Sequence, residues 1–427
     1  MRIAVQGQTA LQGDYTPSGN SNAAIATIAA SLLTDAPVTL QHVPNTLSTE
    51  QMLHLAEQLG ATVTRNESTI QIETPHIQSR SLSASIINSF PASLLFLPAI
   101  LTRRRHAHVE WEQSSPRIYP HLTAMQDLGL TIEPDSTGVS ITAVPWDTAE
   151  LALPWPSVTA TALVCMLAAT LGTKTTLYNA ASEPHLRILQ HQLVQMGAKI
   201  EGIGSNLVTI YGLSGEPSGA NIQLPFDHIE IASVAAIAAI TGGQVSIQNV
   251  HLADMRMILK VYERLGLRYY LQKTDDEANR ILHIPEQDSL RVQVIGDGTL
   301  PIDTSPWPGF PSDLVAITTV LATQVRGTTL IHEKLFDNRL LFTDKLKAMG
   351  AQVLLCDPHR AIVIGKCQLY GEYIDSPDVR VGMALLAAAL GAEGESIIDN
   401  AELIDRTFEQ VITKLQYIGA RIEVVQS

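Results

Sequence analysis

A few polar and charged side chains stand at the starts of otherwise apolar segments, where they could carry chemistry. Asp313 begins the run DLVAITTVLA, and Arg380 lies at the start of DVRVGMALLAAAL. Arg406 follows the apolar pair Leu403-Ile404. A carboxylate in such a place can accept a proton, and a guanidinium can bind a phosphate or carboxylate group. These residues favour the binding of an anionic small molecule, with helix capping as the alternative for Asp313, and equally for Asp378 and Asn22.

The composition argues against several other classes of protein. Of the 427 residues, 45% are apolar and only 16% are charged, so the chain can bury a large core in roughly two or three domains. The net charge of -14 argues against a nucleic-acid or anionic membrane surface, and Arg103-Arg104-Arg105 is better explained as a solvated turn. No apolar run is long enough to cross a bilayer. The three unpaired cysteines predict reduced thiols and a cytoplasmic protein.

Neither a metal nor a cofactor is predicted. The 13 histidines include no H-E-x-x-H pattern, so no metal ligand set is expected. The glycines form neither G-x-x-x-x-G-K-[ST] nor a G-x-G-x-x-G that follows a strand. Any chemistry therefore depends on the protein's own side chains.

Six internal repeats organise these residues. A helix-like stretch that ends in an apolar residue and a glycine recurs six times, at spacings of 69, 68, 69, 84 and 69 residues. The glycine is typical of a left-handed helix C-terminus, and a strand-like run follows each one. The glycines are Gly60, Gly129, Gly197, Gly266, Gly350 and Gly419.

Each repeat also contains a second helix that is apolar almost all round, which requires burial on every side. These helices are expected to begin near Asn22, Pro91, Val158, Ile229, Asp313 and Asp378. Equivalent helices start at equivalent places, so their N-termini, which favour anions, are expected to gather on one face of each domain. The long spacing of 84 contains LQKTDDEANRILHIPEQDSL, which is interpreted as an inserted polar hairpin.

Several motifs resemble those of the enolpyruvyl transferases, and most closely the branch that uses a UDP-sugar. The resemblance covers the whole chain, through VQGQTALQG, SGNSNAAI, SVTATALVCMLAATL, FPSDLVA, LFDNRL, DVRVGMA and IDRTFEQVITKLQYIGA. It implies an α/β (α+β) fold class: two inside-out α/β barrels built from six repeats, the EPSP synthase-like fold. The implied domains are 18–224 and 1–17 plus 225–427, because the N-terminal strand of this family crosses to the second domain.

The resemblance also implies a reaction and roles for individual residues. The family transfers an enolpyruvyl group from phosphoenolpyruvate to a sugar hydroxyl and releases phosphate. Asp313 matches the base beside the sugar 3'-hydroxyl, and Arg380 and Arg406 match arginines that hold phosphoenolpyruvate. The remaining positions match substrate contacts: Asn22 to the sugar nucleotide, Arg339 at the same cleft, Ser157 and Val158 in a uridine-side turn, and Leu335 through its backbone.

The first domain departs from the family pattern at several positions. The motif Ser-Gly-Ala-Lys-Asn reads Ser18-Gly19-Asn20-Ser21-Asn22, so Ser21 replaces the catalytic lysine in the substrate site. Pro91 replaces an arginine. The loop WEQSSPRIYPHL is about four residues shorter and has no cysteine, while Glu112 or Ser115 could occupy that space and Arg117 could replace the loop arginine.

Three functions therefore stay open at this point. The first is enolpyruvyl transfer to the 3'-hydroxyl of UDP-N-acetylglucosamine or a related nucleotide sugar, as in peptidoglycan synthesis. The second is enolpyruvyl transfer to another acceptor in secondary metabolism. The third is a catalytically impaired relative that binds a UDP-sugar or a partner protein. The oligomeric state is left unassigned.

Overall fold

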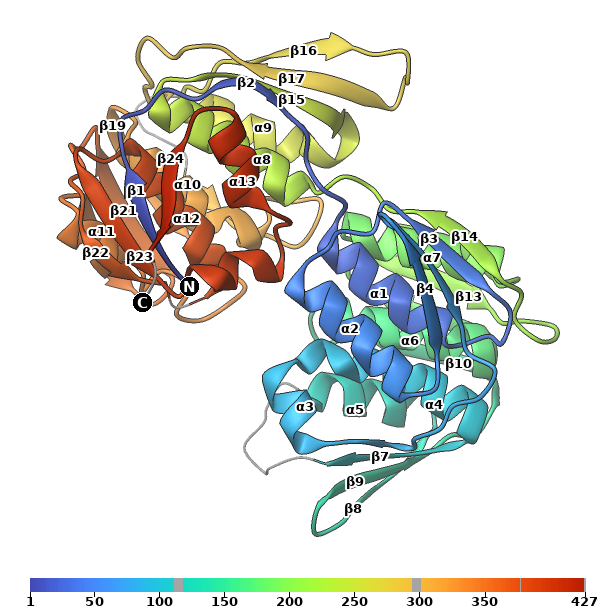
Figure 1. The fold of residues 1–427 in the computed structure, drawn as a ribbon. Helices are drawn as coiled ribbons and strands as arrows, with labels where there is room; N and C mark the ends of the chain where they lie inside the picture. Colours follow the sequence, from blue (N-terminus) through green and yellow to red (C-terminus); the bar gives the residue numbers. More distant parts are fainter. Residues whose placement is uncertain (111–117, 294–300, 377, 426–427) are drawn as a thin grey trace. The chain divides into compact units, whose positions relative to one another are not determined.

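The chain folds into two compact units in a computed structural model that describes residues 1–110, 118–293, 301–376 and 378–425 (Figure 1). The first unit is Gly19–Pro225, and the second unit combines Met1–Ser18 with Phe226–Ser427. Each has its own apolar core. Among the described residues, each unit has three four-stranded sheets.

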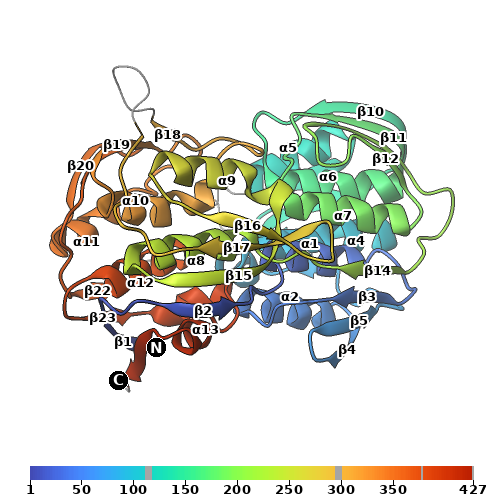
Figure 2. The same cartoon turned by 90° about the horizontal axis from the view of Figure 1, so that it is seen from above.

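The three sheets of the first unit share one topology, in which a parallel pair of strands is extended by an antiparallel hairpin. Figure 2 shows β14 running beside β3, where the end of this unit pairs with its beginning. The sheets are β14 (Ala220–Gln223), β3 (Val38–Gln41), β5 (Thr69–Glu73), β4 (Thr62–Asn66); β6 (Ser81–Leu82), β7 (His106–Glu110), β9 (Gly138–Thr142), β8 (Thr131–Pro134); and β10 (Trp146–Ala152), β11 (Gly172–Tyr178), β13 (Leu207–Tyr211), β12 (Lys199–Glu201).

In the second unit, the N-terminal segment completes two of the sheets. Strand β1 pairs with β23 and β24, and β2 pairs in parallel with β15. The sheets are β22 (Tyr373–Asp375), β23 (Glu395–Asp399), β1 (Arg2–Gln6), β24 (Arg421–Val425); β16 (Tyr270–Lys273), β17 (Asn279–Ile284), β15 (Gln244–His251), β2 (Gln12–Tyr15); and β18 (Ile302–Asp303), β19 (Gly327–His332), β21 (Arg360–Gly365), β20 (Gln352–Asp357).

Two kinds of helix accompany these sheets, as the repeat pattern predicted. The almost wholly buried helices are α1 (Ser21–Ser31), η1 (Pro91–Phe96) with α4 (Leu97–Arg104), α6 (Val158–Leu171), α8 (His228–Thr241), η3 (Ser312–Leu314) with α10 (Val315–Thr323), and α12 (Val379–Gly391). The amphipathic helices are α2 (Leu47–Gln58), α5 (Tyr119–Asp127), α7 (Pro184–Gln195), α9 (Leu252–Arg264), α11 (Thr343–Ala348) and α13 (Val411–Tyr417). The short helices α3 (Ala84–Ser89) and η4 (Ala401–Arg406) lie outside this scheme.

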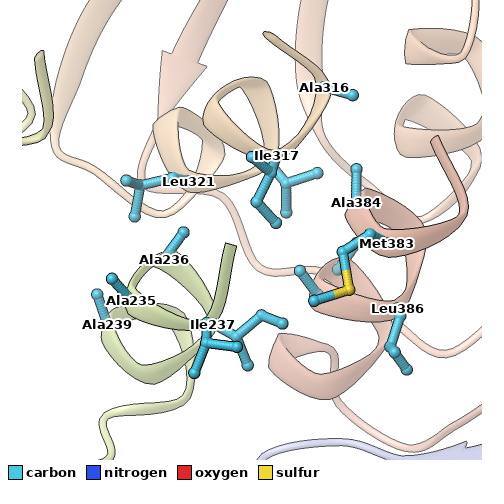
Figure 3. Packing of buried hydrophobic residues seen from close by; sticks show 14 of the residues in the cluster. Ala235, Ala236, Ile237, Ala239, Ala316, Ile317, Leu321, Met383, Ala384 and Leu386 are labelled. Carbon is cyan, nitrogen blue, oxygen red and sulfur yellow. The ribbon is translucent and has the colours of Figure 1, made fainter. Parts of the chain in front are cut away.

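The glycine that follows each amphipathic helix has a positive φ in all six repeats, between 83° and 113°. The predicted left-handed helix termini are therefore confirmed. The buried helices of the second unit pack directly on one another. Figure 3 shows Ile237 of α8, Ile317 of α10 and Met383 of α12 within one apolar cluster, together with alanines of the same helices.

The interpretation of LQKTDDEANRILHIPEQDSL as an inserted hairpin is wrong. Strands β16 and β17 in this stretch form a hairpin that four of the other sheets also contain, equivalent to β4 and β5 in the first sheet. The extra residues follow that hairpin instead: 17 residues separate β17 from β18, against 3 to 8 at the equivalent places elsewhere. A polar turn marks a hairpin in the sequence, but it does not show which hairpin is additional.

Arg103 and Arg104 do not form the predicted solvated turn. The guanidinium of Arg103 donates to the carbonyl oxygens of Thr34 at 3.3 Å and Pro75 at 2.8 Å, and Arg104 donates to that of Ile77 at 2.6 Å. Both side chains therefore tie the end of α4 to neighbouring segments of the first unit.

Gly212 lies closer to the backbone of Gly172 than any amino acid with a Cβ atom could. A Cβ atom there would lie 1.9 Å from the carbonyl oxygen of Gly172, at the end of α6. Gly212→Ala should lower the free energy of unfolding by about 2–3 kcal/mol, because backbone at both ends of this contact must shift. Urea denaturation measures the change. Gly215→Ala is the matched control in the same unit, since its Cβ meets no atom within 4 Å; equal losses in the two variants would contradict the prediction.

Candidate functional site

Asp313 lies where the chain enters α10, and two arginines bind its carboxylate. Oδ1 accepts hydrogen bonds from Nε of Arg380, in the first turn of α12, and from Nη1 of Arg339 at 3.2 Å, in the loop after β19. The structure thus brings together three of the predicted site residues. The capping alternative is wrong for Asp313, because Pro311 occupies the N-cap position of η3. It is correct for Asp378, whose Oδ1 accepts from the N–H groups of Arg380 and Val381.

The charges of this cluster shift the pKa values of its members. Burial alone would raise the pKa of Asp313, but the charges of Arg380 and Arg339 outweigh it and hold that pKa below its ordinary value. The Asp313 carboxylate in turn raises the pKa of Arg380. Burial and the nearby Arg380 charge lower the pKa of Arg339. The Arg380 side chain is 45% exposed and that of Arg339 only 19%, so Arg380 is the cation that a dissolved anion can reach.

Arg406 ends η4, which packs against α12. The approach is close, since a Cβ atom at Gly382 would lie 2.9 Å from Cγ1 of Ile404. The half-buried Arg406 side chain forms no hydrogen bond or ion pair within the ranges that the structure describes. The guanidinium of Arg406 is therefore available to bind an anion. The segment that carries it, η4, contacts the helix of Arg380.

Leu335 presents an exposed side chain, but its backbone is partly engaged. Its N–H donates to Oε1 of Glu333 at 2.8 Å. The predicted backbone contact between Leu335 and a ligand would therefore use the carbonyl oxygen. Neither Glu333 nor Ser312 was predicted from the sequence. Ser312 adjoins Asp313 in the FPSDL motif, which was a usable signal, whereas Glu333 follows β19 outside every such motif and gave none.

In the first unit, the start of α1 differs from the expectation. Asn20 caps the helix by accepting from the N–H of Ala23 at 2.8 Å, so the capping alternative for Asn22 is wrong. The half-buried amide of Asn22 forms no hydrogen bond to any described residue. Ser21 is only 1% exposed, and its hydroxyl lies 3.0 Å from that of Thr46. Its hydroxyl therefore has an internal partner.

The predicted uridine-side turn begins α6. Ser157 is the N-cap of this helix and accepts from the N–H of Ala160 at 3.3 Å, and Val158 is the first helical residue. Both are half-buried. Beside them, Nε2 of the buried His121 lies 2.8 Å from the hydroxyl of Thr159. Substrate contacts by Ser157 and Val158 stay a prediction.

Asp227, at the N-cap of α8, is a buried carboxylate of the second unit. Burial and the charge of Glu230 raise its pKa to about 7, against the bonds from two backbone N–H groups. The folded state thus holds a proton that the unfolded chain loses near pH 4, so this group's contribution to stability is complete below pH 4 and is lost as the pH rises through 7. Asp227→Asn should raise the free energy of unfolding by about 2–3 kcal/mol at pH 8, with the gain vanishing near pH 4. Denaturation at both pH values measures it; a gain that does not depend on pH would contradict the assignment.

Residues 5–415 match the family described as EPSP synthase (3-phosphoshikimate 1-carboxyvinyltransferase). The chain belongs to this family. As an EPSP synthase family member it is an enolpyruvyl transferase, and the predicted fold class of two inside-out α/β domains is confirmed.

Relatives within this enolpyruvyl transferase family match over almost the whole chain. The protein from Treponema denticola named UDP-N-acetylglucosamine 1-carboxyvinyltransferase is 38% identical and the match covers 98% of both chains. One of the same name from Bradyrhizobium diazoefficiens is 38% identical, over 100% of this chain and 98% of the relative. The solved enolpyruvyl transferase NikO from Streptomyces tendae has a TM-score of 0.86 at 22% identity, covering 99% of this chain and 98% of its own.

The first part of the shortened loop in the first domain is not among the described residues. Three residues predicted for this loop of the enolpyruvyl transferase therefore lie outside the described residues: Arg117, Glu112 and Ser115.

Within the described ranges, no three His, Cys, Asp or Glu side chains gather as metal ligands. No helix among those ranges is long and apolar enough to span a membrane. Cys165 is buried within α6, which raises the pKa of its thiol to about 12, as for a cysteine that packs in the core.

Proposed function

We propose that the protein transfers the enolpyruvyl group of phosphoenolpyruvate to the 3'-hydroxyl of UDP-N-acetylglucosamine, or of a related nucleotide sugar, with release of phosphate. The observation that carries this proposal is the 38% identity, over 98% of both chains, to a protein named UDP-N-acetylglucosamine 1-carboxyvinyltransferase. The Asp313 carboxylate before α10, with Arg380 at the start of α12 and Arg339 in the loop after β19, fits this chemistry. A nucleotide-sugar acceptor also fits the cytoplasmic location expected from the cysteines.

The residues would divide the reaction between them. Asp313 accepts the proton of the acceptor hydroxyl, whose oxygen then bonds to C2 of phosphoenolpyruvate while C3 gains a proton. Loss of a proton from C3 and departure of phosphate from C2 then restore the vinyl group on the product. Arg380 and Arg406 hold the phosphate and carboxylate groups as their charge redistributes. Asn22, Ser157, Val158, Leu335 and Arg339 contact the substrates in this proposal.

Substrate binding itself would change the basicity of Asp313. In the free protein its carboxylate is a weak base, because it is bound to Arg380 and Arg339. A phosphoenolpyruvate anion competes for Arg380, the more exposed of the two arginines. As that bond is exchanged, the pKa of Asp313 rises toward its ordinary value, so the base becomes effective only when the donor substrate is present.

The test is phosphate release from phosphoenolpyruvate with UDP-N-acetylglucosamine, together with mass spectrometry of the products. We expect a product heavier than the acceptor by one enolpyruvyl group and one phosphate for each product formed. An absence of both at high protein concentration would contradict the proposal. Calorimetry with UDP-N-acetylglucosamine then separates a protein that binds this sugar from one that does not.

A different acceptor is the second candidate, and the start of α1 favours it. Ser21 stands where the family has a lysine, and its buried hydroxyl is bonded to Thr46. A neutral, internally bonded group cannot supply the positive charge of a lysine ammonium. The start of α1 therefore offers less positive charge to an anionic substrate than the family motif does. Incubation of phosphoenolpyruvate with a panel of sugar and nucleotide acceptors tests this. Product formed with UDP-N-acetylglucosamine alone would eliminate it, and no product with any acceptor would favour a catalytically impaired relative.

A further inference from the structure

We propose that Glu333 is a positioning residue of the transfer site: its carboxylate fixes the guanidinium of Arg339 beside Asp313. The proposal rests on the proposed function for the role of Asp313 and Arg339 in turnover. It goes beyond that function because Glu333 matches none of the motifs that carry the resemblance and is an otherwise unexplained buried charge. The side chain is 0% exposed, in the loop between β19 and α11.

Four donors converge on the Glu333 carboxylate. Oε1 accepts from the Thr304 hydroxyl at 3.0 Å and from the backbone N–H groups of Leu335 at 2.8 Å and Phe336 at 3.1 Å. Oε2 accepts from the Ser312 hydroxyl at 2.5 Å. A carboxylate that accepts from four donors is well matched to its surroundings, and it joins the segment before η3 to the loop that carries Arg339.

The hydroxyl groups of Ser312 and Thr304 donate their protons to Glu333, because a carboxylate can only accept and the other polar neighbour of each hydroxyl is itself a donor. The oxygen of Ser312 accepts from Nη1 of Arg339 at 2.7 Å, and that of Thr304 accepts from the N–H of Lys334 at 2.8 Å. Each hydroxyl proton therefore points at the Glu333 carboxylate. The orientation of Ser312, and through it the position of Arg339, depends on an acceptor at Oε2 of Glu333.

A second route from Glu333 reaches the same arginine. Phe336, whose N–H is held by Oε1, places its ring under the guanidinium of Arg339, with Cζ 4.0 Å from the ring centroid. Arg339 is thus held by Ser312 through one oxygen of Glu333 and by Phe336 through the other. The same Nη1 atom of Arg339 that donates to Ser312 also donates to Oδ1 of Asp313, at 3.2 Å.

The alternative is that Glu333 only stabilises its own turn, and Glu333→Gln separates the two roles. An amide oxygen in the place of Oε1 can keep all three of its bonds, whereas the NH₂ group in the place of Oε2 presents a donor to the Ser312 hydroxyl. The variant therefore preserves the turn and breaks the link to Ser312 and Arg339. Its kinetics test the positioning role while its circular dichroism and melting temperature monitor the fold.

The first experiment is a double-mutant cycle on kcat, with phosphoenolpyruvate and the acceptor that the wild type uses. Glu333→Gln and Ser312→Ala should each lower kcat by about 10- to 100-fold, and the double variant should be no worse than the more severe single variant. Glu230→Gln is the control, because Glu230 is also 0% exposed in the second unit but bonds Tyr15 and Lys414 instead. Its effect should multiply with that of Ser312→Ala. Multiplicative effects for Glu333 as well would overturn the proposal.

The second experiment needs no turnover. Phenylglyoxal modification of the substrate-free protein, read by peptide mass spectrometry, should be several-fold faster at Arg339 in Glu333→Gln than in the wild type. Arg264 is the internal control, because it donates to the carbonyl of Pro301 at 2.6 Å and lies outside this network. An unchanged rate at Arg339, or an equal rise at Arg264, would overturn the positioning role. A wild type without transfer activity would contradict the proposed function instead, so the two failures are distinguishable.

Discussion

Asp313→Asn should lower kcat for enolpyruvyl transfer by about 10²- to 10⁴-fold, the range expected when a general base is lost. Asparagine keeps the size of the side chain but cannot accept the proton of the acceptor hydroxyl. The overall fold should persist, because both arginines remain partly solvated. Removal of the carboxylate between them should cost about 1–3 kcal/mol of stability, since two like charges are left facing each other. Phosphate-release assays and thermal denaturation measure the two effects separately.

Asp254→Asn is the matched control for this variant. Asp254 is 4% exposed, lies in the first turn of α9 and bonds Nδ1 of His251 at 2.8 Å, away from the arginine cluster. Its replacement should reduce stability with little change in kcat. The pH dependence of kcat/KM adds a second check: since the pKa of Asp313 lies below its ordinary value, its protonation in the free enzyme should affect the rate only below about pH 4. Unchanged turnover in Asp313→Asn would contradict its role as base.

Arg380→Gln should lower kcat/KM for phosphoenolpyruvate by about 10²- to 10³-fold, as expected when a charged hydrogen-bond donor to a phosphate is removed. The variant should also raise the pKa of Asp313, because Arg380 is the arginine that lowers this pKa more strongly. The acidic limb of the pH profile should therefore move to higher pH. Steady-state kinetics at several pH values measure both consequences in one experiment.

Arg380→Lys and Arg2→Gln complete this test. Lysine keeps the charge but not the planar fork of the guanidinium, so its activity should lie between those of the wild type and Arg380→Gln. Arg2 is an arginine of similar exposure, 37% against 45%, that is paired with Asp399 in the same unit. Loss of activity in Arg2→Gln as large as in Arg380→Gln would show that the effect is a general one of surface charge.

Periodic features of the sequence predicted the architecture well. The six glycines could be found because left-handed helix termini strongly favour glycine, and all six have positive φ. The buried helices could be found because they lack a polar face. The inserted hairpin was misidentified because a polar turn is local, whereas its assignment to a repeat depends on strand pairing such as that of β16 with β17.

The site was less predictable, because its contacts are not periodic. Asp313, Arg339 and Arg380 were found through motifs, but their mutual ion pairs join residues 26 and 67 positions apart. The capping alternative named Asn22, two residues after the observed cap Asn20, since both asparagines are suitable caps and only the backbone conformation distinguishes them. The network of Glu333 was not predicted because its hydrogen-bond donors come from separate segments.

The position of β1 in its sheet determines the order in which the protein can be completed as it is synthesised. In Figure 1 the blue β1 lies with the red β23 and β24, and Ile3 pairs with Ile398 and Val424. Because every strand pair of the first unit lies within Gly19–Pro225, that unit can close its sheets when about half of the chain has emerged from the ribosome. At about 5–20 residues per second, β1 must wait roughly 20–80 s for both of its neighbours. During that time it is an unpaired strand, and its length of five residues, with Arg2 at one end and Gln6 at the other, limits its pairing with other chains.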